Sequence, residues 1–177
     1  VYHVTNLSDE GTGSLRDALS KEGRIVVFDL DGAINLKSTL YIPSNTTILA
    51  QTAPGEGITV TGYDVQAADG AKDVIVRYLK VRPTDKNGGE PDGLGGKFGT
   101  RIVFDHCSTS WCVDELLTLY AGSYESTSET KPHGSYYTVQ NTIASESLRM
   151  SSHFKGAHGY GAIWGADMAS YHHNLLA

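Results

Sequence analysis

The sequence predicts an all-β fold, a right-handed parallel β-helix that forms one domain over residues 1–177. Short segments rich in Val, Ile, Thr and Tyr recur along most of the chain and are separated by Gly, Asn and Asp, as strands and turns are. Similar segments recur at intervals of 27, 27, 37 and 33 residues, centred on Ile48, Ile75, Ile102, Val139 and His172. A repeat of this length indicates stacked coils, each of which buries its inward side chains on the next.

A β-sandwich is the alternative architecture. It would join paired antiparallel strands through recurrent Asn-Gly or Asp-Gly turns. Asp31-Gly32 and Asp92-Gly93 are the two cases in this sequence, so the pattern favours coils.

One helix is predicted, from Ser14 to Gly23. Ser14 is a typical N-cap, and Asp17 stands three residues later, which is a capping-box arrangement. The apolar residues at 15, 18 and 19 share one helical face, and Gly23 suits the C-terminal stop. We expect this short helix to cover the N-terminal end of the coil stack, where unpaired strand edges need a cap.

Eight strands follow. They are predicted over Ile25–Leu30, Ala33–Leu36, Thr46–Ala50, Ile58–Thr61, Val74–Val81, Ile102–Phe104, Tyr137–Ile143 and Tyr171–Leu176. No capping helix follows the last of them. We therefore expect these residues to be the N-terminal part of a longer domain, and the bare last coil to favour self-association.

Composition excludes several classes of protein. A net charge of −6, from 14 Lys and Arg against 20 Asp and Glu, argues against nucleic acid as a partner. No apolar run approaches the roughly 20 residues that span a bilayer, so we expect no membrane insertion. Cys107 and Cys112 are five residues apart, too far in an extended stretch for a disulfide, and we predict free thiols with at least one buried.

Several motifs in order resemble family 1 polysaccharide lyases, the pectate lyases. They are the segments at 6–19, 25–32, 44–48, 51–55, 76–83, 105–108, 153–156 and 172–175. The resemblance runs nearly end to end. It implies a right-handed parallel β-helix, a Ca²⁺ cofactor, β-elimination of polygalacturonate (pectin) and a secreted protein, extracellular or periplasmic.

The first candidate calcium ligands are Glu90 and Asp92. Two carboxylates two residues apart in an extended stretch share a face, and the glycine-rich flanks indicate a loop, where sites often lie. The family carries acidic ligands at this point, and Asp92 fits best.

Asp114 and Glu115 are the second pair. The resemblance implies two acids here, in an Asp-Gly-x-x-Asp pattern; the later one is Asp114, whereas Ser110 replaces the earlier one. Glu115 could substitute for the missing acid. Neighbouring residues on a strand point to opposite faces, so both can be ligands only if the backbone bends there.

Lys155 matches the family lysine that holds a substrate carboxylate, and Arg149 is a second candidate for the same subsite. In the family, an arginine removes the substrate proton. The resemblance places that arginine beyond Ala177, so the catalytic base is unknown.

Other readings remain open at this stage. His106 with Asp105 and Ser108 or Ser110 could be a catalytic triad, although a structural role for His106 is favoured. His153, His158, His172 and His173 could hold zinc. At the level of function, the alternatives are an acidic-polysaccharide-binding β-helix without activity, or a polygalacturonase-type hydrolase on the same scaffold.

Overall fold

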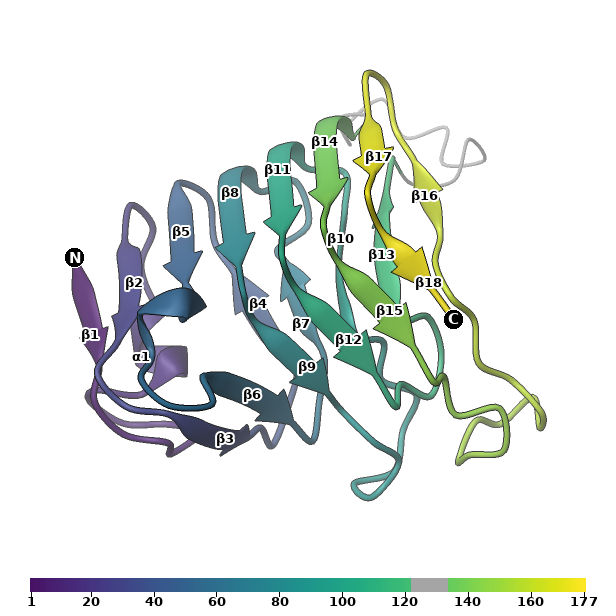
Figure 1. Ribbon diagram of the computed structural model, residues 1–177, viewed down its shortest axis with the longest axis horizontal. Coiled ribbons are helices and arrows are strands. Elements are labelled where there is room, and N and C mark those ends of the chain that lie inside the picture. Colours follow the sequence, from purple (N-terminus) through teal and green to yellow (C-terminus); the bar gives the residue numbers. More distant parts are fainter. Residues whose placement is uncertain (122–133) are drawn as a thin grey trace.

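The computed structural model describes residues 1–121 and 134–177. The chain winds into a stack of coils, and each full coil contributes one strand to each of three parallel sheets (Figure 1). Every strand pair is parallel among the described residues. The parallel β-helix predicted from the repeat is confirmed.

The seven-stranded sheet contains β1 (Tyr2–Val4), β2 (Ile25–Phe28), β5 (Thr46–Leu49), β8 (Lys72–Arg77), β11 (Thr100–Asp105), β14 (Ser135–Gln140) and β17 (Ser170–His172). The six-stranded sheet contains β3 (Gly32–Asn35), β6 (Ile58–Thr61), β9 (Lys80–Arg82), β12 (Ser108–Ser110), β15 (Ile143–Ser145) and β18 (Leu175–Leu176). The five-stranded sheet contains β4 (Leu40–Ile42), β7 (Val65–Ala67), β10 (Leu94–Lys97), β13 (Leu117–Tyr120) and β16 (Trp164–Gly165).

The core is a set of apolar columns that run along the coil axis. In the seven-stranded sheet, Ile48 pairs with Val76, and Val76 with Phe104. All three are fully buried. The predicted register, which aligned Ile48 with Ile75, is wrong by one residue. Because successive side chains of a strand point to opposite faces, this slip places Ile75 outside, where it is 37% exposed.

Three predicted strands are each two strands in the structure. The divisions fall at or beside Tyr78, Asn141 and His173, whose φ angles are between +52° and +60°. One residue in this left-handed conformation turns the chain sharply, so it passes from the seven-stranded sheet into the six-stranded sheet. Hydrophobic runs continue across these turns, and the sequence pattern therefore merges the two strands.

None of the eight predicted strands lies in the five-stranded sheet. Its strands are short, and β10 contains two adjacent glycines, Gly95 and Gly96, which disfavour strands. The sheet exists because its strands pair with those of neighbouring coils, which is a tertiary effect.

The predicted helix is present but shorter. Helix α1 spans Leu15–Ala18, and the Ser14 hydroxyl caps it by accepting a hydrogen bond from the Asp17 N–H at 3.1 Å. In a full capping box, the Asp17 side chain would also bond to the Ser14 N–H. That bond is absent, because the Asp17 carboxylate instead accepts a hydrogen bond from the Tyr2 hydroxyl at 2.5 Å. Leu15 and Ala18 are fully buried against the first coil, as expected of a cap. A single 3-10 turn, η1 (Ala50–Thr52), follows β5.

Both cysteines are free and buried, as predicted. Burial raises the pKa of the Cys107 thiol to about 12 and raises the pKa of Cys112 further. Within the two described ranges, no helix is long and apolar enough to cross a membrane.

Candidate functional site

Three carboxylates from two consecutive coils converge where β10 and β13 begin. Leu94 of β10 pairs with Leu117 of β13, so Asp92 and Glu115, each two residues earlier, occupy equivalent positions. Asp92 Oδ1 accepts a hydrogen bond from the Glu115 N–H at 3.3 Å. One oxygen each from Asp92, Asp114 and Glu115 all lie within 4.8 Å of one another. We call these three residues the acidic cluster.

A bend in the backbone allows Asp114 and Glu115 to face the same point. Residues 113 and 114 are bends rather than strand, and the N–H groups of both donate to Pro91 O, at 3.0 and 3.4 Å. Strand alternation allows Asp114 and Glu115 to be ligands together only if the backbone bends between the strands, and it does. Ser110, at the position where the resemblance implied an acid, lies in β12 and is 4% exposed.

The charged form of Asp92 is disfavoured within the acidic cluster. Burial raises the pKa of Asp92 to about 8, and repulsion by Glu115, Asp64 and Asp114, together with a hydrogen bond to Glu115, adds to the shift. Oxygen ligands, several negative charges and irregular geometry are what Ca²⁺ accepts. The donor set fits Ca²⁺.

Two histidines lie close to Asp114 of the acidic cluster. His158 Nε2 lies 2.8 Å from Asp114 Oδ1, and His153 Nε2 lies 3.4 Å from Asp114 Oδ2. The imidazole rings stack with centroids 3.7 Å apart. His153 is buried, and its Nδ1 accepts a hydrogen bond from the Lys155 N–H at 3.1 Å. His158 therefore orients the Asp114 carboxylate, and His153 supports the His158 ring by stacking on it.

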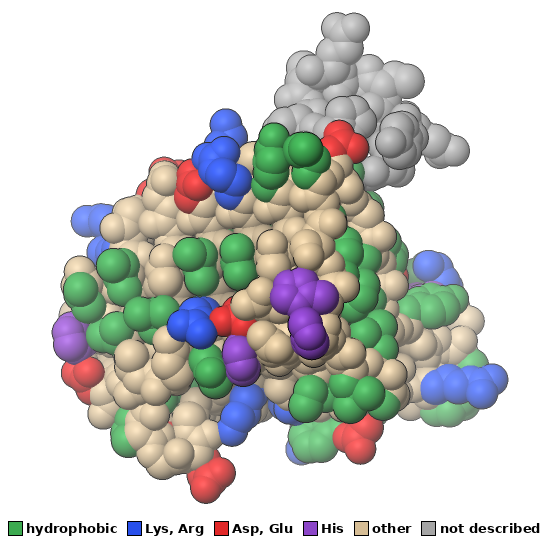
Figure 2. Space-filling model, turned by 45° about the horizontal axis from the view of Figure 1, so that its top comes forward, with side chains coloured by type: hydrophobic (Ala, Val, Ile, Leu, Met, Phe, Trp, Pro, Cys, Tyr) green, Lys and Arg blue, Asp and Glu red, His purple; other side chains and the backbone are tan. Residues whose placement is uncertain are grey.

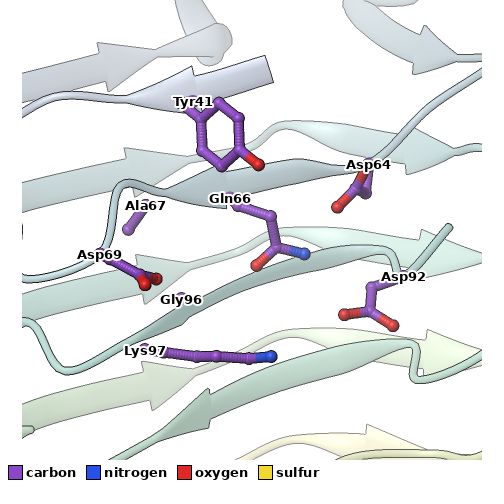
Figure 3. Close-up of a pocket in the computed structure, with 8 residues that line it drawn as sticks. All are labelled: Tyr41, Asp64, Gln66, Ala67, Asp69, Asp92, Gly96 and Lys97. Carbon is purple, nitrogen blue, oxygen red and sulfur yellow. The ribbon is translucent and has the colours of Figure 1, made fainter. Parts of the chain in front are cut away.

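A hollow beside the cluster lies over the outer face of β4, β7 and β10. Figure 3 shows Gln66 and Lys97 pointing into it, with Asp64 and Asp92 at one end. Gln66 Nε2 is buried and has no hydrogen-bond partner among the described residues, so it is a donor available to a ligand. A Cβ on Gly95 would lie 2.5 Å from Gln66 Oε1, and this glycine thus makes room for the amide.

Lys97 brings a positive charge close to the acidic cluster. Its ammonium lies over the Tyr120 ring, 5.4 Å from the centroid. Burial alone would lower the pKa of Lys97, but a hydrogen bond to Tyr120 and the charges of Tyr120, Asp92 and Asp69 raise it overall. The lysine is therefore fully charged at neutral pH and could bind an anion on the sheet.

Glu90 lies outside the acidic cluster, although it was predicted with Asp92. Its Oε1 accepts a hydrogen bond from the Phe154 N–H at 3.0 Å and lies 3.6 Å from His153 Nδ1. Its role as a ligand stays a prediction.

The two predicted substrate cations are exposed. Lys155 Nζ lies over the Phe154 ring, 5.4 Å from the centroid. In the described part of the chain, neither Lys155 nor Arg149 forms an ion pair with the acidic cluster. Their roles stay predictions.

His106 has the structural role favoured by the sequence. Its Nδ1 lies 2.6 Å from Asp105 Oδ1, and its ring stacks on Tyr78. The Ser108 hydroxyl is instead 2.5 Å from Arg82 Nη2 and accepts its hydrogen bond. These contacts give no support to a catalytic triad.

The four histidines considered for zinc fall into two pairs. His153 and His158 meet at Asp114, whereas His172 and His173 contact each other, with Nδ1 atoms 2.7 Å apart. Figure 2 shows histidine side chains gathered on an outer face beside rows of exposed hydrophobic side chains. A four-histidine zinc site is not formed.

Sequence reasoning missed Gln66 and Lys97 as site residues, and it named His153 and His158 only as candidate zinc ligands. The spacing of acids in the sequence could have indicated one further site residue, Asp64. Asp64 precedes Asp92 by 28 residues, one fewer than the 29 that separate the paired residues Val65 and Leu94 of the same two coils. An acid repeated at close to the coil period is a candidate for the same region of the stack.

Comparison with known proteins now adds to this geometry. No protein-family model matches the chain. A probable pectate lyase C from Aspergillus fumigatus is 42% identical over 152 residues, which cover 86% of this chain and 33% of the relative. The corresponding protein of Neosartorya fischeri is 41% identical over the same shares. Probable pectate lyase 13 of Arabidopsis thaliana is 27% identical over 70% of the chain and 26% of its own length.

The chain spans about a third of the length of the fungal relatives that it matches. A crystal structure of Jun a 1, the major allergen from cedar pollen, superposes with a TM-score of 0.64 at 20% identity, over 82% of this chain and 44% of that chain. This likeness shows a shared fold. Over 86% of its residues the chain is thus similar in sequence to a protein named probable pectate lyase.

Proposed function

We propose that this chain forms the calcium-binding and substrate-binding part of a pectate lyase, which cleaves polygalacturonate by β-elimination. The observation that carries the proposal is the acidic cluster of Asp92, Asp114 and Glu115, which lies at the edge of a hollow containing Lys97. An anionic polysaccharide would be repelled by a bare acidic site. A bound cation reverses the sign of the site and lets the polymer bind.

In this reaction, a base removes the proton at C5 of a uronate, and the bond from C4 to the glycosidic oxygen breaks. Bound Ca²⁺ would withdraw charge from the substrate carboxylate and so make the C5 proton more acidic. The three carboxylates of the cluster would hold the ion, and His158, which stacks on His153, keeps Asp114 in position. No residue is assigned here as the base.

Substrate carboxylates that do not contact the cation need other partners. Lys97 and Gln66 offer an ammonium and an amide donor on the sheet. Lys155 and Arg149, which are exposed, are proposed to bind carboxylates on the other side of the cluster. Because pectin occurs outside cells, we further propose that the protein is secreted.

Three measurements on the chain test the proposal. Isothermal titration should show Ca²⁺ binding that Asp92→Asn weakens, and polygalacturonate should bind more tightly with Ca²⁺ than with a chelator. The ultraviolet absorbance of the new C4–C5 double bond reports elimination. The absence of calcium-dependent polygalacturonate binding would refute the proposal.

The same experiment separates the alternative functions. Calcium-dependent binding without the double bond would favour an acidic-polysaccharide-binding protein. Reducing ends that form without the double bond, and despite a chelator, would indicate a hydrolase.

A further inference from the structure

A second cavity, of about 370 Å³, lies at the ends of β3, β6 and β9. It is lined by residues of four consecutive coils, among them Asn35, Arg82, Lys86, Asn87 and Trp111. No carboxylate lines it, in contrast to the acidic cluster and its hollow. Its volume is in the range of small-ligand sites. The cavity therefore suits an anion that needs no bridging metal.

Arg82 presents one free edge of its guanidinium. Nη1 donates to Val81 O at 2.9 Å and to Ser108 O at 2.7 Å, and Nη2 donates to the Ser108 hydroxyl at 2.5 Å. Because Ser108 receives bonds from both terminal nitrogens, it occupies the edge between them. The Nε–H and the second Nη2–H have no acceptor among the described residues. This pair of parallel donors matches a carboxylate.

The cavity carries two cations, Arg82 and Lys86, and the charge of Glu146, which bonds the Trp111 indole, acts on Arg82 and offsets part of this positive charge. Neither Arg82 nor Lys86 forms an ion pair within residues 1–121 and 134–177. The protein as a whole has a net charge of −6. Two cations without ion pairs at one cavity are therefore unusual for this chain. They favour an anionic ligand.

Trp111 provides a fixed aromatic surface at the same cavity. Its side chain is 45% exposed, and its indole N–H donates to Glu146 Oε2 at 2.9 Å. Its backbone is tied to both neighbouring coils, since its N–H donates to Glu146 O and its carbonyl accepts from the Thr84 N–H, each at 3.0 Å. A rigid indole face can pack against the apolar C–H face of a sugar ring at little entropic cost.

We infer that this cavity is a metal-independent binding site for a uronate residue of an acidic oligosaccharide. The carboxylate binds the free edge of Arg82, the ring packs on Trp111, and the amides of Asn35 and Asn87 bind hydroxyl groups. The inference rests on the proposed function for the identity of the sugar. It adds a site that works without calcium.

Residues 84–92 and 111–115 join this cavity to the acidic cluster. Each short segment has one end at the cavity and the other end at the cluster.

The test is titration of the protein with saturated trigalacturonate in the presence of a chelator. Binding is expected, and Arg82→Gln and Trp111→Ala should each weaken it at least about tenfold, since each removes one of the two main contacts. Lys86→Gln should weaken it by a smaller factor. The controls are Arg101→Gln and Tyr136→Ala, which remove an exposed arginine and an exposed aromatic elsewhere and should leave the affinity unchanged.

Arg82→Gln also removes bonds to Ser108, so its thermal unfolding must be compared with that of the wild type. Trp111→Ala leaves those bonds intact, so its affinity tests the inference if Arg82→Gln does not fold. Equal affinity of Trp111→Ala and wild type in chelator, or no binding in chelator, would overturn the inference.

The two proposals fail differently. Loss of calcium-dependent binding with chelator-resistant binding retained would refute the calcium site and leave the cavity intact. The reverse result would refute the cavity alone. Methyl-esterified trigalacturonate, which lacks the negative charge, should bind less tightly than the free acid if Arg82 contacts the carboxylate.

Discussion

Asp92 and Glu115 occupy equivalent positions on consecutive coils, and the Asp92 carboxylate accepts a hydrogen bond from the Glu115 backbone N–H at 3.3 Å. The β-helix thus superposes two acids that are 23 positions apart in the chain. Stacking like charges at one register position is unfavourable by itself. It becomes favourable when a divalent cation lies between them.

Removing one of these acids should separate calcium binding from stability. Asp92→Asn is expected to lower calcium affinity at least about tenfold, because one charged ligand is lost. Without calcium, the variant should be about as stable as the wild type at neutral pH, and more stable above about pH 8, where the wild type must hold a buried and repelled carboxylate. Titration calorimetry and thermal unfolding measure the two effects. Glu22→Gln, at an exposed position with the same change of charge, should alter neither.

Calcium binding should depend on pH through Asp92, whose pKa is raised to about 8 by burial and by its acidic neighbours. Calcium must displace the proton, so affinity should increase as the pH rises towards 8. The metal-free fold has the opposite dependence. The folded state holds a proton that the unfolded state releases near pH 4, so this stabilisation is present below that pH and is lost as the pH rises through 8.

Denaturant unfolding at pH 5 and pH 9 measures this dependence in the metal-free protein. Asp92→Asn should reduce the difference by on the order of 2 kcal/mol. An unchanged difference would show that Asp92 is not the group responsible.

Lys97 should affect substrate and calcium in opposite directions. In Lys97→Gln, polygalacturonate binding is expected to weaken roughly tenfold, because a cation that faces the hollow is lost. Calcium affinity should stay equal or increase, since a positive charge near Asp92 is removed. Parallel titrations with Ca²⁺ and with polygalacturonate report both. A fall in both affinities would indicate that Lys97 only supports the fold.

Asp105 should be a main contributor to stability. It pairs in register with Arg77 on one side and Gln140 on the other, so its carboxylate joins three coils. Burial alone would raise the pKa of Asp105, but hydrogen bonds from Gln140, His106, Arg77 and Asn141 lower it to about 2. The stability it contributes is present above about pH 4 and is lost as the pH falls towards 2.

Asp105→Asn is therefore expected to cost roughly 2–4 kcal/mol in the free energy of unfolding, because it removes the buried carboxylate that four side chains share. Asp73→Asn is the matched control, since Asp73 forms an exposed pair with Arg101 in the same sheet. It should cost less than about 1 kcal/mol. Equal losses in the two variants would contradict the assignment.

The strand register can be tested at two adjacent residues. Val76 is fully buried between Ile48 and Phe104, whereas Ile75 points outwards. Val76→Ala should cost roughly 2 kcal/mol, because it leaves a cavity in the core column. Ile75→Ala removes a larger side chain but should cost less than about 1 kcal/mol. Denaturant unfolding measures both, and the opposite order would support the register shifted by one residue.

Much of the fold follows from the sequence. The recurrence of β-branched segments predicts coils, and Ser14 predicts the start of the capping helix, because both are local properties of the chain. The five-stranded sheet could not be predicted in this way. Gly95 and Gly96 have low strand propensity and become strand only because β7 and β13 pair with them on either side.

The candidate site likewise depends partly on the sequence and partly on the tertiary structure. The sequence by itself determined the acidic residues Asp92, Asp114 and Glu115, since carboxylates in a polar stretch are visible in a list of residues. Tertiary structure decided which carboxylates meet. The bend at 113–114 turned Asp114 and Glu115 to one side, and the pairing of Leu94 with Leu117 brought Asp92 beside them. Register between coils depends on packing across 23 or more residues, and no local pattern carries that information.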